Sequence, residues 1–313
     1  MQRRLFIAAS CLAGCASGPE EQVRVATPGQ PLLWRRLQGG FVAPALAAPG
    51  SLPRPAGGLY VRWMRPGAVA LRGNEVLVAD VGTGRLWRTD TVGNQVTSIA
   101  GAVASVNTAL ALGPDLSAWV LDTALRQVLR FGRDGRLMQS YSIGITSPGP
   151  VGFALADGGA TLMLADGMAA LWSEQRSPGS FVRSVLPTRQ DGVRVSGVDA
   201  LVLASDGVFV LDRLQAVVYR TTRQGQVLQT LGQGELLQPM ALAADRLDRV
   251  HVWDAQDGSI KRLRPGAPAL RWTAAELGVQ QIGGLAIDGL MLAVTDAVEG
   301  QVVLHSLAHD TAP

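Results

Sequence analysis

Aspartates recur at six regularly spaced positions of the chain, and a carboxylate can bind a cation, move a proton or hold a turn. Each follows a short apolar run, and the intervals between them are 42, 44, 46, 42 and 42 residues. A carboxylate directly after a strand readily accepts hydrogen bonds from the N–H groups of the turn that it begins. Because a feature repeated in every unit serves what every unit needs, we interpret these residues as structural. They are Asp80, Asp122, Asp166, Asp212, Asp254 and Asp296.

Arginines stand eight residues after four of these aspartates, and a ring of guanidinium groups could bind anionic glycans or lipid headgroups. They are Arg88, Arg130, Arg220 and Arg262. The alternative is that each guanidinium group ties together strands and turns of the fold. Because the arginine returns in most units, as the aspartate does, we favour the structural interpretation.

Histidines and asparagines are the other groups that catalysis or metal binding would need, and both are scarce. Two of the three histidines lie in strand-like runs of adjacent units and one lies in the tail: His251, His305 and His309. Asn74 and Asn94 lie in turn sequences, where asparagine has a local backbone role, and this leaves Asn107 alone. No Gly-x-Ser-x-Gly nucleophile motif occurs in the sequence. We therefore predict no catalytic residue, no metal site and no cofactor.

The elements that position these residues are short strands. In the first unit the apolar runs are "AVAL", "VLVAD", "RLWRT" and "QVTSI", with turn residues between them and no helical period. A period of 40 to 50 residues marks a repeat architecture, and six antiparallel four-stranded units form a six-bladed β-propeller. We predict this all-β fold for residues 58–313.

The sixth unit ends without a fourth apolar run, so the ring needs a strand from elsewhere. "GLYVRWM", residues 58–64, stands just before the first strand of the first unit. We predict that this N-terminal segment completes the sixth blade and closes the ring. Closure removes the unpaired strand edges that would recruit other chains, so we expect a monomeric propeller.

The units resemble NHL-type propeller repeats. The family's pattern, an apolar strand ending in Asp, a short turn and then a strand with Arg, is present in "VADVGTGRLWR" and "VLDTALRQVLR". The resemblance implies the fold strongly and the function weakly, because this propeller carries many unrelated activities. Gluconolactonase-like members use one Glu, two Asn and an Asp around a divalent ion, and amidating-lyase and streptogramin-lyase members use several histidines. The asparagines and histidines of this chain do not match either pattern.

The first residues, "MQRRLFIAASCLAGC", predict where the protein goes. Arg3 and Arg4 precede an apolar stretch of about ten residues, too short to span a bilayer as a helix. "LAGC" is typical of a lipobox, in which residues 1–14 are removed and Cys15 carries the lipid. The alternative is an ordinary secretory signal with an incidental cysteine. Ala16 after the cysteine resembles outer-membrane sorting, so we predict a cell-envelope lipoprotein held in the outer membrane through Cys15 and facing the periplasm or the cell surface.

The composition of the remaining chain limits its partners. Removing residues 1–14 leaves one cysteine, so no internal disulfide can form, and the formal net charge falls from +3 to 3 − 2 = +1. No cluster of basic and aromatic residues typical of nucleic-acid binding occurs, so we predict no nucleic-acid partner. Residues 15–57 are rich in Pro, Gly and Ala, which predicts a tether. Within it, residues 31–42 are apolar, and the pattern leaves open whether they pack on the propeller.

Function in a propeller concentrates at the mouth of the central channel, near the first strand of each blade. The residues that break the repeat there are Trp63, Arg65, Asn107, Asp199, Gln238 and Gln281. They share no chemistry, so we predict a non-catalytic binding or scaffold module for an envelope protein or a surface polymer. The alternative is a metal-dependent lactonase- or lyase-type propeller enzyme with a divergent site.

Overall fold

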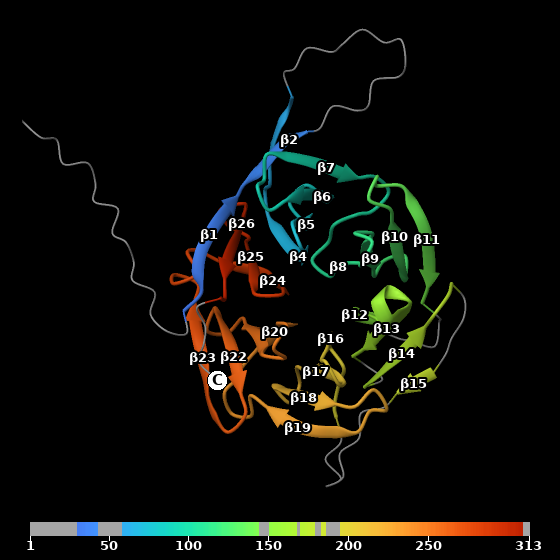
Figure 1. Cartoon of the computed structure of the whole chain (residues 1–313), viewed down its shortest axis with the longest axis vertical. Helices are drawn as coiled ribbons and strands as arrows, with labels where there is room; N and C mark the ends of the chain where they lie inside the picture. The colour runs from blue at the N-terminus through green and yellow to red at the C-terminus, as the bar shows by residue number, and fades with distance from the viewer. Residues whose placement is uncertain are drawn as a thin grey trace, which may run out of the picture.

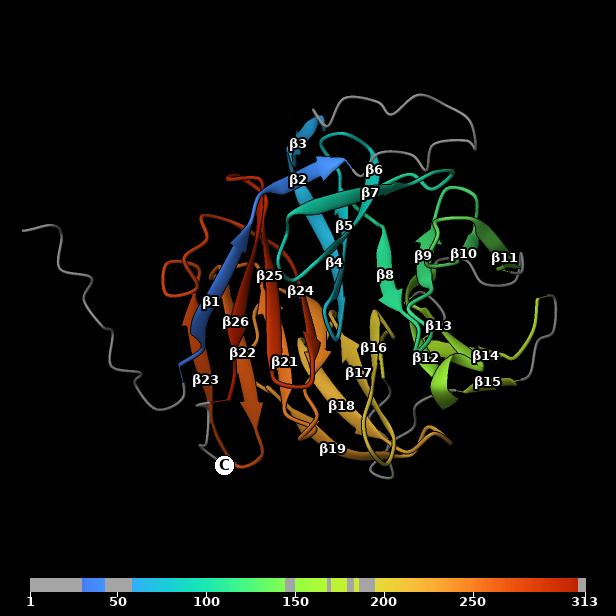
Figure 2. The same ribbon diagram turned by 45° about the horizontal axis from the view of Figure 1, so that its top comes forward.

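The fold is a ring of six β-sheets around a central axis, antiparallel except where β2 pairs with β7 (Figure 1). The computed structural model describes residues 30–42, 58–143, 150–167, 170–178, 183–185 and 195–308. The predicted six-bladed β-propeller is confirmed. In each blade the first strand lines the axis and the fourth lies on the rim, as Figures 1 and 2 show.

The blades follow one another along the chain, and each contains consecutive strands except at the seam described below. Blade 1 contains β4 (Pro66–Arg72), β5 (Glu75–Asp80), β6 (Arg85–Asp90) and β7 (Gln95–Ile99). Blade 2 contains β8 (Ala109–Leu112), β9 (Ala118–Asp122), β10 (Gln127–Phe131) and β11 (Leu137–Ser142). Blade 3 contains β12 (Pro150–Ala156), β13 (Thr161–Asp166), β14 (Leu171–Gln175) and β15 (Arg183–Val185), with the short 3-10 helix η1 (Asp157–Gly159).

The second half of the ring has the same order. Blade 4 contains β16 (Ala200–Leu203), β17 (Val208–Asp212), β18 (Val217–Thr221) and β19 (Val227–Leu231). Blade 5 contains β20 (Pro239–Ala244), β21 (Val250–Asp254), β22 (Ser259–Arg264) and β23 (Ala267–Thr273). Blade 6 contains β24 (Ile282–Asp288), β25 (Met291–Asp296), β26 (Gln301–Ser306) and, from the other end of the chain, β1 (Leu32–Leu37).

The second strand of each blade explains the apolar runs of the sequence. Strands β5, β13 and β17 are buried along almost their whole length. A strand that is covered on both faces has no solvent side, so its apolar residues are continuous and do not alternate with polar ones. These strands therefore form the middle of each blade, between its neighbours on both sides.

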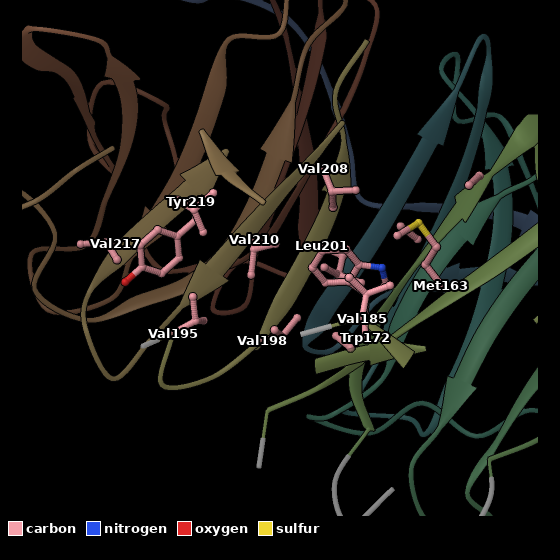
Figure 3. Packing of buried hydrophobic residues seen from close by; sticks show 14 residues of the cluster. Met163, Trp172, Val185, Val195, Val198, Leu201, Val208, Val210, Val217 and Tyr219 are labelled. Atoms are coloured by element: carbon pink, nitrogen blue, oxygen red, sulfur yellow. The ribbon is translucent and has the colours of Figure 1, made fainter. Parts of the chain in front are cut away.

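The core is divided into six buried clusters among the described residues, one between each pair of neighbouring blades. Figure 3 shows the cluster between blades 3 and 4, where Met163 and Trp172 pack with Leu201 and Val208. Burial of apolar surface stabilises the fold by about 25 cal/mol per Å², so each blade is held mainly by the two blades beside it.

An N-terminal strand closes the ring, as predicted, but it is not the segment that we expected. Strand β1 pairs antiparallel with β26, from Leu32 opposite Ser306 to Leu37 opposite Val302. The prediction that residues 58–64 complete the sixth blade is wrong. Of these residues only β3 (Tyr60–Arg62) is a strand, and it pairs with β2 (Gly39–Val42), which runs parallel to β7 on the rim of blade 1. Strand β1 has five residues paired with β26, whereas β3 has three residues in all, and β1 also buries Leu37.

Part of the expected tether is therefore folded. Residues 32–42 form strands of blades 6 and 1, which settles the question left open for residues 31–42. Cys15, the predicted signal and the rest of the segment 15–57, at 15–29 and 43–57, lie outside the described residues. In the part of the chain that is described, no helix has the length and apolarity to cross a membrane.

A candidate binding face at the channel mouth

The six repeated aspartates lie where the second strand of each blade ends. We call this side of the ring the entry face, because the first strand of each blade also begins there. In blade 1 the Asp80 carboxylate accepts hydrogen bonds from the backbone N–H of Met64 at 3.2 Å and of Arg65 at 2.8 Å. It also accepts one from the Thr83 hydroxyl at 2.8 Å. Asp80 thus joins the loop that enters the blade to the turn between β5 and β6.

Blades 4 and 6 repeat this arrangement. Asp212 accepts a bond from Ser196 N–H at 2.7 Å, and Asp296 accepts one from Gln280 N–H at 2.8 Å. Both carboxylates are fully buried. Burial alone would raise the pKa of Asp296, but hydrogen bonds from backbone N–H groups outweigh it and lower the pKa. The charged carboxylate is therefore the form that holds the loop.

Blade 5 adds a buried cation to the same arrangement. Asp254 accepts bonds from Leu237 N–H at 2.8 Å and Gln238 N–H at 2.9 Å, and Lys261 Nζ lies 2.7 Å from Oδ2, the oxygen that also accepts from Leu237. Lys261 also lies 2.9 Å from Asp257 and donates to the carbonyl oxygen of Glu235. Burial would lower the pKa of Lys261 and raise that of Asp254. The charge-assisted hydrogen bonds between them outweigh burial in both groups, so the pKa of Lys261 is raised and that of Asp254 is lowered.

In blade 2 the entering loop is held by a different hydrogen bond, which does not involve the repeated aspartate. The Asp122 carboxylate accepts a bond from Leu125 N–H at 2.8 Å, within its own turn, and is only partly buried. The loop that enters the blade is held by Thr108, whose hydroxyl accepts a bond from Ser105 N–H at 2.8 Å. The two hydroxyls are also 3.2 Å apart. In blade 3 Asp166 is buried at the end of β13.

The predicted mouth residues occupy equivalent places on the entry face. Arg65, Gln238 and Gln281 each immediately precede the first strand of a blade, and their side chains are exposed while their N–H groups donate to the repeated aspartates. Asn107 is exposed in the loop before β8. Asp199, just before β16, is half-buried and accepts a bond from Arg213 N–H at 2.8 Å. The structure thus places these five residues at corresponding positions around one face.

Trp63 does not belong to this set, which corrects its predicted role. Its side chain is 1 % exposed and packs with Leu37 and Val302 between blades 6 and 1. The backbone around it is also crowded, because a Cβ on Gly300 would lie 2.2 Å from the Trp63 carbonyl oxygen. Position in the repeat suggested a loop residue, but the large apolar side chain turns inward to fill the seam.

The two histidines of the described residues are buried in structural positions. His251 contacts the carbonyl oxygen of Arg249 through Nδ1 at 3.1 Å and stacks on Trp272, with 5.4 Å between ring centroids. His305 Nε2 lies 3.1 Å from the carbonyl oxygen of Leu277. Burial lowers the pKa of His251 to about 3 and that of His305 to about 4. His309 lies outside the described residues.

The repeated arginines contact protein acceptors on the face opposite the entry face. Arg88 donates to the carbonyl oxygen of Leu116 in the next blade at 2.9 Å, and Arg130 pairs with Asp115 at 2.7 Å. Arg220 pairs with Asp206 at 2.9 Å, and Arg262 is almost fully buried. In the first three arginines the guanidinium group ties the third strand to a turn between first and second strands.

Two hollows lie away from the channel mouth. One of about 330 Å³ lies between blades 4 and 5 and is lined by Arg220, Arg249 and Phe209 among others. The other, of about 520 Å³, lies on the rim along β1 and β2 and includes Arg35 and Phe41. Sequence reasoning missed the rim hollow because it depends on where residues 32–42 dock. Within the described ranges, no three His, Cys, Asp or Glu side chains gather closely enough to hold a metal ion.

Comparisons with known proteins reveal similarity of fold. No family model and no curated protein matches the chain. A streptogramin B lyase structure shares 11% identity over 78% of this chain and 93% of its own, with a TM-score of 0.58. A structural-genomics protein of unknown function from Bacteroides thetaiotaomicron shares 14% identity over 78% of this chain and 70% of its own, with a TM-score of 0.59. The WD40 propeller domain of Doa1 shares 11% identity over 88% and 97%, with a TM-score of 0.57.

These identities are so low that the likeness establishes the propeller fold alone. The resemblance to NHL-type repeats is consistent with it. The neighbours include a lyase and a WD40 domain, so the fold by itself is compatible with catalysis and with binding.

Proposed function

We propose that this protein is a lipoprotein of the cell envelope whose propeller is a non-catalytic binding or scaffold module for another envelope protein or a surface polymer. The observation that carries the binding role is the entry face. Buried aspartates fix the backbone of three entering loops, while the adjacent side chains of Arg65, Gln238 and Gln281 are exposed and differ from blade to blade. A rigid backbone that presents different side chains suits recognition, because little conformational entropy is lost on binding.

The groups that a propeller enzyme would use support the same proposal. His251 and His305 are buried, and their lowered pKa values keep them neutral at physiological pH. The carboxylates of four repeated aspartates accept hydrogen bonds from loop N–H groups: Asp80, Asp212, Asp254 and Asp296. Neither set is open to a substrate. The similarity to a streptogramin B lyase therefore gives no reason to assign catalysis to these histidines and aspartates.

The binding face can be tested with a matched pair of variants. Arg65→Ala with Gln238→Ala removes one arginine and one glutamine from the entry face, and Arg246→Ala with Gln224→Ala removes the same two types from exposed turns of the opposite face. Tagged full chain is used to capture envelope components from solubilised membranes. We expect at least one component to be lost with the first variant and retained with the second. If the entry-face variant captures the same envelope components as the unchanged protein, the proposed binding role of the entry face is wrong.

The predicted anchor has its own test. Cys15→Ala should move the protein from the membrane fraction to the soluble fraction, while Cys11→Ala, a cysteine four residues earlier, should not. Sorting to the outer membrane is measured by separating the two membranes on a density gradient. Retention of the Cys15→Ala protein in the membrane would contradict lipidation at this residue.

The enzyme alternative makes a different prediction in a binding experiment. Calorimetric titration of the full chain with calcium and with zinc should give no stoichiometric binding. Tight binding that is lost on Asp199→Ala or Asn107→Ala would favour a metal-dependent lactonase or lyase.

A further inference from the structure

Exposed apolar side chains concentrate on one part of the rim. Five large apolar residues there are at least half exposed, and they come from β1, β2 and the start of β3, together with the exposed Arg35. We call this set the rim patch: Leu33, Trp34, Phe41, Leu59, Tyr60 and Arg35. Elsewhere among the described residues, Leu125 and Leu214 are exposed on separate turns, and Leu137 and Met138 are exposed side by side in the chain on β11. Within the rim patch Arg35, Phe41 and Tyr60 border one hollow, and exposed apolar residues gathered on one part of a surface mark a contact site.

The side chains of the rim patch are held in place by the strands beneath them. Phe41 and Tyr60 meet edge to face with 5.2 Å between ring centroids, and both border the hollow of about 520 Å³ that includes Arg35. Trp34 lies at a register shift between Leu33 and Arg35, where β1 bulges away from β26. A bulge in an edge strand blocks the addition of a further strand. The register shift therefore makes β1 a poor edge for a further strand, although β3 is also the outermost strand of its sheet.

The chemistry of the rim patch fits a bilayer surface. Tryptophan and tyrosine have an apolar ring with a polar group, and they favour the boundary between lipid headgroups and acyl chains. Arginine beside them is attracted to anionic headgroups by about 1 kcal/mol per residue. The combination of half-exposed aromatic rings and a cation is what a lipid surface binds.

The place of the rim patch in the chain says which surface would meet a membrane. Strand β1 is the first described element, and it begins 17 residues after Cys15. A fully extended chain spans at most about 3.5 Å per residue, so these residues reach at most about 60 Å. If Cys15 carries the lipid, β1 is the part of the propeller that is tethered most closely to the bilayer.

We propose that the rim patch docks the propeller on a bilayer containing anionic lipid, so that the ring stands on its rim beside β1, β2 and β3. This inference rests on the proposed membrane anchor and adds an orientation to it. Strands β1 and β2 lie on the rim of the ring (Figures 1 and 2), so in this orientation the entry face stays open to a partner while the rim contacts lipid.

Trp34 supplies a local reporter for this contact. All seven tryptophans of the chain are described, and five are at most 2 % exposed: Trp63, Trp87, Trp119, Trp172 and Trp272. Trp253 is partly buried, and Trp34 is 50 % exposed. Quenching of fluorescence by brominated lipid acts over short range, so it should report Trp34 almost alone, and Trp34→Phe should abolish it.

The experiment uses the full chain carrying Cys15→Ser, with vesicles of phosphatidylcholine alone or mixed with phosphatidylglycerol, both brominated. We expect quenching with the mixed vesicles and about a tenfold loss of vesicle affinity on Phe41→Ala with Tyr60→Ala. The matched control is Leu125→Ala with Leu214→Ala, which removes two exposed leucines from other blades and should leave affinity unchanged. Vesicle binding that all variants share is attributed to the N-terminal residues, which are the same in every variant.

The outcomes separate this proposal from the anchor. Quenching that depends on Phe41 and Tyr60 supports the rim patch even if Cys15→Ala leaves cell fractionation unaltered. Absent quenching, or quenching equal in the rim variant and the control, overturns it. A dimer of the parent chain that becomes a monomer in the rim variant, by light scattering, also overturns it, because a second copy would then cover the patch.

Discussion

Blades 5 and 2 carry the same aspartate at the same place and use it differently. In blade 5 Asp254 is fully buried, holds two loop N–H groups and pairs with Lys261. In blade 2 Asp122 is partly exposed and holds only its own turn, while Thr108 and Ser105 hold the entering loop. A residue that recurs in a repeat therefore does not contribute equally in each copy. Its contribution to stability depends on how deeply it is buried and on how many N–H donors have no other acceptor.

Removing the cation of blade 5 should have the largest effect. Lys261→Met leaves Asp254 buried and charged without its partner, and breaking a buried ion pair in this way typically costs about 3–5 kcal/mol. We expect a loss of unfolding free energy of that order, measured by urea denaturation at neutral pH. Arg136→Met, which removes an exposed cation from blade 2, is the control and should change stability by less than about 0.5 kcal/mol. Equal losses would contradict the role of Lys261.

The two aspartates themselves give the direct comparison. Asp254→Asn replaces a buried acceptor of several bonds and should cost about 3 kcal/mol, whereas Asp122→Asn should cost less than about 1 kcal/mol. Both variants keep the size of the side chain, so packing is not the variable. The measurement is the urea midpoint with an unchanged slope. If Asp122→Asn is as costly as Asp254→Asn, the motif acts uniformly around the ring.

Acid should weaken blades 5 and 6 before it weakens blade 2, which contains no histidine. The unfolded chain protonates His251 and His305 near pH 6.5, but burial lowers the folded pKa to about 3 and about 4. Stability from these groups is therefore complete above pH 6.5 and is lost as the pH falls toward 4. At pH 5 the loss is about 2 kcal/mol per histidine. His251→Phe should flatten the dependence of the urea midpoint between pH 7 and 5, and an unchanged slope would contradict this.

The smallest loss of stability should come from removing the hydrogen bond between Ser105 and Thr108, which holds the entering loop of blade 2 in place of the aspartate. Thr108→Val removes the acceptor of the Ser105 N–H, and one such hydrogen bond contributes about 1 kcal/mol. Ser105→Ala keeps that bond and should cost less. Hydrogen exchange of the Ser105 amide gives a local readout, which should quicken in Thr108→Val and not in Ser105→Ala. Identical exchange in both variants would show that the hydroxyl of Thr108 does not hold the loop.

Local pattern was enough to predict the blades, because each blade is specified by an apolar run, an aspartate and a turn within about 45 residues. The seam was mispredicted because two apolar segments, residues 31–42 and 58–64, compete for the same edge, and the choice depends on pairing with β26 at the far end of the chain. The position of Arg65, Gln238 and Gln281 before the first strands followed from the repeat. The inward turn of Trp63 did not, because only packing at the seam determines it.

The rim patch could not be predicted for the same reason. The sequence contains its residues within 30 positions, but Phe41 and Tyr60 meet only because β2 and β3 pair. The segment "PLLWRRLQGGFV" is more apolar than a linker needs, and this was the one available sign.

The pairing of β1 with β26 also makes closure of the ring a late event in folding. Strand β1 ends at Leu37, and its partner β26 begins only at Gln301. Until β26 is present and paired, the chain is an open array whose outermost strands have no partners, a state prone to aggregation. A truncation that removes β26 would therefore leave β1 without its partner and the ring open.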